Sequence, residues 1–307
     1  MTLTRPPVSI TLPRRADRGP GPRWLRRVDE HWTPADYTHF AVEPMSPTIG
    51  AEIGGLDLRE ALDADLKSQL NRALLEFKVI VFRDQHLTAQ QHIDFGLNWG
   101  EIEEHPFISK GSHDLVQRFE KGENVGGYEN EWHSDNTWMQ IPSLGSILRA
   151  LELPPVGGDT LFADTAAAYD NLSDEVKARL DGLVAEHDWM QAFGLSMPDD
   201  RKAALRERLP PVHHPVVRTH PETGRKMLFV NNNFTRHIVG LPDDEGADLL
   251  AMLYRQCDIP EYQCRLRWRA GTIAFWDNRA VQHYAASDYW PQHRVMERIV
   301  IAGDRPY

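Results

Sequence analysis

Apolar side chains return every three or four positions in four stretches of the chain, which is the spacing of one face of an α-helix. The apolar positions of the four predicted helices are Leu62, Leu66, Leu70, Leu74 and Phe77; Ile93 and Phe95; Leu172, Val176, Leu180, Leu183 and Val184; and Leu249, Leu250, Leu253 and Tyr254. The second helix follows a capping-box sequence, Thr88 to Gln91. We interpret these four stripes as core-facing, with no part in chemistry.

Short apolar runs between turn residues predict strands in the rest of the chain. These runs cover residues 40–42, 49–53, 78–82, 214–219, 225–231, 264–268, 272–276, 281–285 and 298–302. The sequence Pro221-Glu222-Thr223-Gly224 indicates a hairpin between two of them. Many short strands with few helices predict a mainly β fold with flanking helices, of the double-stranded β-helix (jelly-roll, cupin-like) type. Such barrels bind ligands in their mouths.

Charge is unevenly distributed along the 307 residues, whose formal net charge is −11. Residues 1–28 carry seven arginines and one acid, a balance of +6 that leaves −17 for the remainder. We therefore predict a basic, Pro- and Arg-rich arm over residues 1–38, flexible or loosely docked, and one domain over residues 39–307. An arm that packs on an acidic neighbouring subunit is the alternative.

The composition excludes several classes of protein. The acidic net charge argues against nucleic acid as a general partner, because phosphate contacts need clustered lysines and arginines. The first residues contain no apolar run of the length of a signal peptide or a membrane span, so we expect no membrane partner and a cytoplasmic location. Cys257 and Cys264 give no disulfide framework and no trusted zinc pattern. Phosphate-loop, dinucleotide and nucleophile-elbow motifs are missing from the sequence.

His133 and Asp135 are two positions apart, and His283 comes much later in an apolar run. On a strand, residues two apart point to the same face, so both side chains could aim at one interior point. Two imidazoles and a carboxylate cover one face of an octahedral metal and suit non-haem Fe(II). A satisfied core histidine at 283, or a zinc-dependent hydrolase with the same three ligands, are alternatives that spacing alone leaves open.

Arg294 and Arg298 lie four positions apart among apolar residues. A buried guanidinium requires an anionic partner, because an unpaired buried charge is costly. A carboxylate ligand can supply that partner through two parallel hydrogen bonds. A carboxylate of the protein itself is the commoner partner and the simpler explanation.

In combination, the motifs of residues 39–307 resemble the taurine dioxygenase family of Fe(II)/2-oxoglutarate-dependent dioxygenases. They are Trp132-His133-Ser134-Asp135, Gly157-Gly158-Asp159-Thr160, Trp276-Asp277-Asn278-Arg279, Gln282-His283-Tyr284-Ala285, Asp288-Tyr289, Arg294, Arg298 and Gly303-Asp304-Arg305-Pro306. The resemblance implies that His133, Asp135 and His283 bind iron. It implies that Thr160 and Arg294 hold the distal carboxylate of 2-oxoglutarate and that Arg298 meets an anionic substrate group. His105, Phe193 and Phe234 match further positions of the substrate pocket.

Three positions differ from the taurine-type pattern: Glu129, Asn136 and Trp138 replace residues of that substrate pocket. A carboxylate near the substrate would repel a sulfonate and favour an amine, so we do not expect taurine to be the substrate. The resemblance also implies that Asp135 excludes the halogenating relatives, in which a small residue stands at that ligand position.

The resemblance implies an enzyme that uses Fe(II), 2-oxoglutarate and O2 to hydroxylate a C–H bond of a small anionic or zwitterionic substrate, with release of succinate and CO2. No amino-acid general base is required, because the cofactors carry the chemistry. Desaturation and cyclisation are alternative outcomes on the same iron. We expect a homo-oligomer, a dimer or tetramer. A zinc hydrolase and a non-catalytic ligand-binding relative are the competing hypotheses.

Overall fold

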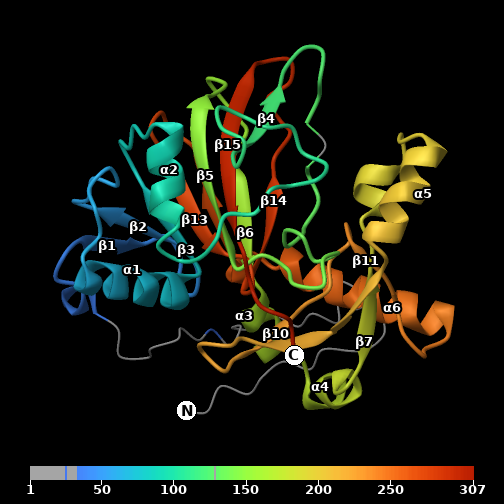
Figure 1. Cartoon of the computed structure of the whole chain (residues 1–307). Helices are drawn as coiled ribbons and strands as arrows, with labels where there is room; N and C mark the ends of the chain where they lie inside the picture. Colours follow the sequence, from blue (N-terminus) through green and yellow to red (C-terminus); the bar gives the residue numbers. More distant parts are fainter. Residues whose placement is uncertain (1–24, 26–32, 128) are drawn as a thin grey trace.

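The computed structural model describes Leu25 and residues 33–127 and 129–307, and it is mainly β with flanking helices (Figure 1). Its strands are β1 (Ala41–Pro44), β2 (Ala51–Gly54), β3 (Val79–Phe82), β4 (Gln117–Lys121), β5 (Gly145–Glu152), β6 (Thr160–Asp164), β7 (Val184–His187), β8 (Val212–Pro215), β9 (Val217–Thr219), β10 (Lys226–Leu228), β11 (Thr235–Ile238), β12 (Gln263–Leu266), β13 (Ile273–Asp277), β14 (Val281–Ala285) and β15 (Arg294–Ile301). The helices are α1 (Ala64–Phe77), α2 (Ala89–Gly96), α3 (Thr165–Asp170), α4 (Asp174–Leu180), α5 (Asp199–Arg208) and α6 (Asp243–Tyr254).

The largest sheet has seven strands in the order β1-β2-β3-β13-β5-β15-β4. β3 is apolar at all four positions, and every position of β3 and β13 is buried, because both faces of the sheet are covered. In β13, Ile273 and Phe275 pack with α1 and α2, whereas Ala274 and Trp276 point to the opposite core. The run at residues 272–276 therefore forms the buried strand that the sequence predicts, shifted by one residue.

The second core lies between this sheet and the three-stranded sheet β12-β6-β14. Phe162 of β6 and Val281 of β14 pack there against Trp276 and Met296 of the larger sheet. Both sheets supply residues of the candidate site, because His283 lies on β14 and Arg294 and Arg298 lie on β15. Figure 1 shows both strands near the centre of the molecule, on the two facing sheets.

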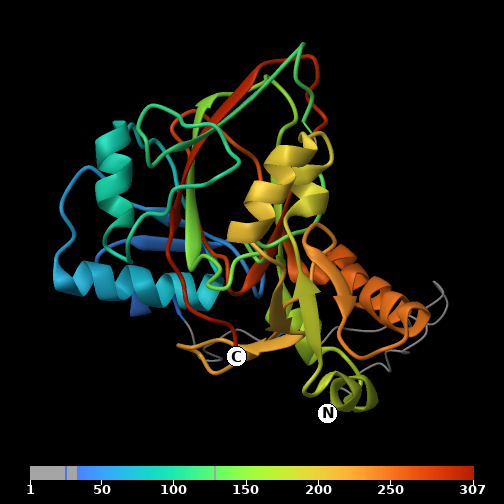
Figure 2. The ribbon, with the colours of Figure 1, turned by 45° about the vertical axis from the view of Figure 1, so that its right-hand side comes forward.

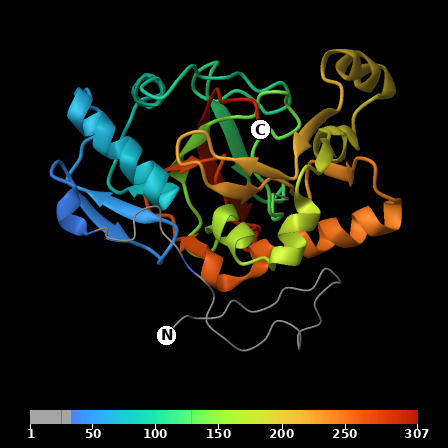
Figure 3. The same ribbon diagram turned by 90° about the horizontal axis from the view of Figure 1, so that it is seen from below.

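Helix ends follow the local sequence signals closely. Asp63 caps α1 by accepting from Leu66 N at 2.8 Å, and Thr88 and Gln91 form the predicted capping box of α2. The predicted helix at 172–184 is correct only for α4: Val184 begins β7 instead. α1 and α2 lie on one side of the sheets, and α5 and α6 lie on the other (Figures 2 and 3).

The predicted hairpin around residues 221–224 is confirmed, because β9 and β10 pair antiparallel. The predicted strand over residues 214–219 is two strands, β8 and β9, separated at Val216. The last predicted strand begins earlier than expected, since β15 starts at Arg294 and not at residue 298. Its eight residues pair with β5 on one edge and with β4 on the other.

Packing of the domain begins before residue 39. Tyr37 is 5% exposed and donates to Glu76 Oε2 at 2.9 Å. Leu25 packs against a cluster that includes residues of α4 and α6. The predicted arm otherwise lies outside the described residues up to position 32. None of the helices in the described ranges combines the length and the apolar run that crossing a bilayer requires.

Candidate active site

The two histidines of the predicted metal site face each other across a single β-bridge. His133 N donates to the His283 carbonyl at 3.1 Å, and His283 N donates to the His133 carbonyl at 2.8 Å. Their ring centres lie 4.2 Å apart. His283 lies on β14 as expected, but the expected regular strand through His133 and Asp135 is wrong, because Asp135 begins a turn.

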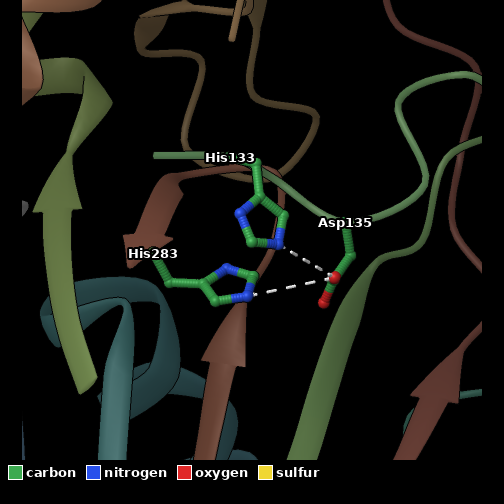
Figure 4. A group of neighbouring side chains, drawn as sticks. All are labelled: His133, Asp135 and His283. Atoms are coloured by element: carbon green, nitrogen blue, oxygen red, sulfur yellow. Dashed lines mark ion pairs between the residues drawn. The ribbon is translucent and has the colours of Figure 1, made fainter. Parts of the chain in front are cut away.

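Asp135 reaches the histidines from this turn because one amide holds its backbone on both sides. Asn278 Oδ1 accepts from Asp135 N at 2.7 Å, and Asn278 Nδ2 donates to the Asp135 carbonyl at 2.8 Å. Asp135 Oδ1 lies 3.9 Å from Nε2 of His133 and 3.9 Å from Nε2 of His283 (Figure 4). All three side chains are buried, and their candidate ligand atoms lie within 4.8 Å of one another.

Burial and nearby charges set the protonation of these side chains. Burial raises the pKa of Asp135, but the Arg298 guanidinium and the two imidazoles lower it by more, so the carboxyl stays ionised. Burial, together with the neighbouring His133, lowers the pKa of His283 to about 3. A carboxylate and a neutral imidazole are the forms that bind metal ions.

The donor set fits a bound iron(II) ion. His133 Nδ1 lies 2.8 Å from the Glu131 carbonyl, so Nδ1 carries the proton and the lone pair of Nε2 points toward Asp135 and His283. Two imidazole nitrogens and one carboxylate oxygen on the same side leave the opposite side open for other ligands. A second buried nitrogen, His283 Nδ1, has no hydrogen-bond partner among the described residues.

Arg294 lines the cavity into which His133, Asp135 and His283 also point. Few hydrogen bonds from the protein satisfy its guanidinium. Its Nη2 donates to the Gly158 carbonyl at 3.2 Å, and its buried Nε has no hydrogen-bond partner among the described residues. Burial lowers the pKa of Arg294. A Cβ on Gly158 would lie 3.0 Å from Arg294 Nε, so this glycine allows the close approach of backbone and guanidinium.

Thr160 lines the same cavity and offers a hydroxyl proton. Its Oγ1 accepts from Trp268 Nε1 at 3.0 Å and donates no hydrogen bond to any described residue. Thr160 and Arg294 therefore present an unused O–H and an unused N–H in one cavity. A carboxylate of a small ligand can accept from both.

Arg298 lies four positions along β15 from Arg294 and contacts Asp135 directly. Its Nη1 donates to both oxygens of Asp135 at 2.7 Å. Its Nε and Nη2 donate to Gln117 Oε1 at 3.1 and 2.8 Å. A carboxylate of the protein thus pairs with this arginine in the structure, which is the simpler of the two explanations that the sequence allowed.

These residues line a cavity of about 410 Å³. His105, Phe193 and Phe234 form one wall, with ring centres 5.5 Å apart between His105 and Phe193 and 6.1 Å apart between the two phenylalanines. Burial lowers the pKa of His105 to about 4, so this wall is uncharged at neutral pH. Trp138 does not line the cavity: it is 1% exposed and packs behind His105 and Phe193, which corrects its predicted contact with substrate.

Asn136 lines the cavity with a left-handed backbone, φ 57°. Asparagine tolerates this conformation better than most residues. Its side chain lies between His105 and Ser143, 3.1 Å from His105 Nε2 and donating to Ser143 Oγ at 2.9 Å. Asn136, which follows Asp135, therefore fixes the orientation of His105.

Glu129 lines the cavity next to Lys121, a residue that no sequence pattern pointed to. Lys121 Nζ lies 2.8 Å from Glu129 Oε1. Lys121 lies opposite Arg294 in the β4–β15 register, and the same register places Gln117 opposite Arg298. The expected repulsion of an anion by Glu129 is therefore offset by a positive charge beside it.

Comparison with known proteins identifies the group to which the chain is similar. The family model of the taurine catabolism dioxygenase TauD, TfdA family matches residues 41–300. An alkylsulfatase from Acinetobacter baylyi is 37% identical over 266 residues, which cover 83% of each chain. An alpha-ketoglutarate-dependent 2,4-dichlorophenoxyacetate dioxygenase from Cupriavidus pinatubonensis is 38% identical over 258 residues, 78% of this chain and 90% of that one.

A solved structure has the same fold. The protein AAD-2, in complex with Mn(II) and N-oxalylglycine, superposes with a TM-score of 0.76 at 31% identity, covering 88% of this chain and 99% of that one.

Proposed function

The chain belongs to the taurine catabolism dioxygenase TauD, TfdA family and is an Fe(II)- and 2-oxoglutarate-dependent dioxygenase, and we propose that it hydroxylates a small organic anion with an apolar body. One observation carries this proposal. A buried two-histidine, one-carboxylate cluster shares a cavity with two buried arginines and an aromatic wall.

Iron and 2-oxoglutarate have distinct places in this proposal. His133, Asp135 and His283 would hold the iron, and Arg294 with Thr160 would bind the distal carboxylate of 2-oxoglutarate. Together with O2, these groups supply an oxidant that replaces a C–H hydrogen by hydroxyl as 2-oxoglutarate becomes succinate and CO2. The buried side chains exclude water from the reacting carbon.

Arg298 would bind the anionic group of the substrate. One edge of its guanidinium faces Asp135, so an anion bound to Arg298 would lie close to the proposed iron ligands. The wall of Phe193 and Phe234 suits an aryl or alkyl body. Because Lys121 offsets the charge of Glu129, nothing in this wall calls for an amine on the substrate.

The relatives support this choice of substrate class. One is named as an alkylsulfatase and another as a 2,4-dichlorophenoxyacetate dioxygenase, and both names describe an anion joined to an apolar body. On a sulfate ester, hydroxylation of the carbon next to the ester oxygen gives a product that collapses to an aldehyde and sulfate. We propose the aryl or alkyl anion as substrate in place of taurine.

Three further features belong to the same proposal. The facing sheets β12-β6-β14 and β1-β2-β3-β13-β5-β15-β4 would form the two halves of a double-stranded β-helix barrel. A dimer or tetramer stays a prediction, as does a cytoplasmic location. The basic arm would have no part in the chemistry.

A substrate panel tests the proposed function. Purified protein is incubated with Fe(II), 2-oxoglutarate and O2, and succinate is measured with hexyl sulfate, 2,4-dichlorophenoxyacetate or taurine at equal concentration. We expect succinate above the substrate-free background with hexyl sulfate or with 2,4-dichlorophenoxyacetate. Where hexyl sulfate is the substrate, hexanal should form together with succinate. Succinate at the background level with all three, or product release without O2, would contradict the proposal.

A further inference from the structure

A single side chain determines how the Arg298 guanidinium is presented to the cavity. Gln117 and Arg298 are directly opposite each other in the antiparallel pairing of β4 and β15. Gln117 Oε1 accepts from Arg298 Nε at 3.1 Å and from Nη2 at 2.8 Å. Both residues are buried, at 4% and 6% exposure, so no bulk water competes with these hydrogen bonds.

The Gln117 amide has one orientation in which it can serve the arginine. Its oxygen must face the guanidinium, since both groups on that edge are donors. Its nitrogen Nε2 is then buried without a hydrogen-bond partner among the described residues. Leaving a buried donor unpaired costs free energy. The hydrogen bonds to Arg298 are the favourable contacts that offset this cost at Gln117.

The remaining contacts of Arg298 lie on its other edge and on its face. Nη1 donates to Asp135, and the guanidinium carbon lies 4.9 Å from the centre of the Phe119 ring. Gln117 therefore holds one edge of the guanidinium and the Phe119 ring covers its face, while the Nη1 edge points to Asp135. Arg298 lines the cavity, so an anion that enters the cavity meets this guanidinium.

We propose that Gln117 is a positioning residue for substrate binding: it orients Arg298 through a neutral acceptor and so leaves the guanidinium charge available to the anionic group of the substrate. This inference rests on the proposed function, in which Arg298 binds that group. A glutamate at 117 would provide the same geometry, but it would add a second carboxylate beside a guanidinium that already pairs with Asp135. An anionic substrate would then meet a neutralised or negative site.

Binding without turnover tests this proposal. Wild type, Gln117→Glu, Gln117→Met and Arg298→Met are loaded with Mn(II) and N-oxalylglycine, and hexyl sulfate and 2,4-dichlorophenoxyacetate are titrated by calorimetry. Hexanol serves as the uncharged probe, and affinities for Mn(II) and N-oxalylglycine are measured separately. We expect both Gln117 variants to bind the better anionic probe about tenfold more weakly than wild type. Gln117→Glu should show the larger loss, and the affinities for hexanol and N-oxalylglycine should stay within about twofold.

The outcomes distinguish a failure of the proposed role of Gln117 from a failure of the proposed function. If Arg298→Met loses the anionic probe while both Gln117 variants bind it as wild type does, the role of Gln117 is refuted and the proposed function stands. If wild type binds neither anionic probe, or if Arg298→Met binds them unchanged, both fail. If hexanol and N-oxalylglycine weaken as much as the anion in Gln117→Met, Gln117 has only a structural role. The melting temperature of each variant identifies any that does not fold.

Discussion

Arg298 donates from one nitrogen, Nη1, to both carboxylate oxygens of Asp135, at 2.7 Å each. Asp135 is also the carboxylate of the three-ligand cluster, so a guanidinium and a metal ion share one ligand. Ser146 Oγ donates to the same carboxylate at 2.9 Å. The structure therefore predicts that the charge of Arg298 weakens metal binding while it keeps the empty cluster neutral overall.

Removal of this charge should strengthen metal binding. Arg298→Met loses a positive charge that lies next to the carboxylate ligand, so we expect Mn(II) to bind about tenfold more tightly or better in calorimetry of metal-free protein. Arg298→Lys keeps the charge and is the matched control, with an affinity near that of wild type. Weaker Mn(II) binding in Arg298→Met would mean that the arginine supports the cluster and does not oppose the ion.

Arg294 should determine the requirement for 2-oxoglutarate. Arg294→Met removes a buried guanidinium whose Nε has no described partner, and truncating one partner of a buried charge pair costs roughly 3–5 kcal/mol. We expect the dissociation constant of N-oxalylglycine to rise by between about a hundredfold and a few thousandfold, with Mn(II) affinity unchanged. An unchanged dissociation constant for N-oxalylglycine would remove Arg294 from this role.

The pair of Lys121 and Glu129 should tune the preference for charge on the substrate. Glu129→Gln removes the carboxylate beside the lysine, so hexyl sulfate should bind about three- to tenfold more tightly. Lys121→Met should weaken hexyl sulfate by a similar factor and should favour taurine, which carries an amine. The double variant is the control and should return close to wild type. Shifts in the same direction for the two single variants would refute a charge effect.

His92 should make the protein less stable as the pH falls. Burial lowers its pKa to about 3, whereas an exposed histidine in the unfolded chain titrates near 6.5. The unfolded state therefore binds more protons between these values. The stabilisation is present above about pH 6.5 and is lost as the pH falls toward 3. From pH 7.5 to 5 the contribution of His92 to the free energy of unfolding should drop by about 2 kcal/mol.

Urea unfolding at the two pH values measures this contribution. His92→Gln cannot titrate, yet its amide can donate to the Ile147 carbonyl that lies 3.1 Å from His92 Nε2. The loss of stability between pH 7.5 and 5 should be smaller in this variant by about 2 kcal/mol. Ionised carboxylates such as Asp277, whose pKa is lowered by Arg279, lose their contribution only below about pH 4 and do not affect the comparison. An equal loss in both proteins would refute the role of His92.

The sequence predicts those parts of the site that depend on local spacing. The alternation along β14 and β15 places His283, Arg294 and Arg298 on the faces of these strands that line the cavity, because side chains alternate on a strand. The capping box of α2 and the hairpin of β9 and β10 are equally local and are present as predicted. A short apolar run such as that of β3 is also a local signal, so it could be assigned to a buried strand from the sequence.

Contacts between distant segments could not be predicted from the sequence. Asn278 holds Asp135 in its turn across 143 positions, and Gln117 meets Arg298 across 181 positions. Strand pairing determines both contacts, and its register depends on the whole fold. The partner of Glu129 was missed in the same way, because Lys121 faces the cavity only through the position of β4 beside β15. Trp138 was predicted in the pocket from the family resemblance, which does not separate a wall residue from the layer packed behind it.

Crystals grown without O2 in the presence of Mn(II) and N-oxalylglycine test most directly whether His133, Asp135 and His283 bind one metal ion. We predict one Mn(II) ion bound by Nε2 of His133, Nε2 of His283 and a carboxylate oxygen of Asp135, with N-oxalylglycine reaching from the metal to Arg294. A metal bound elsewhere, or imidazoles of His133 and His283 that point to different places with no ion between them, would contradict the account.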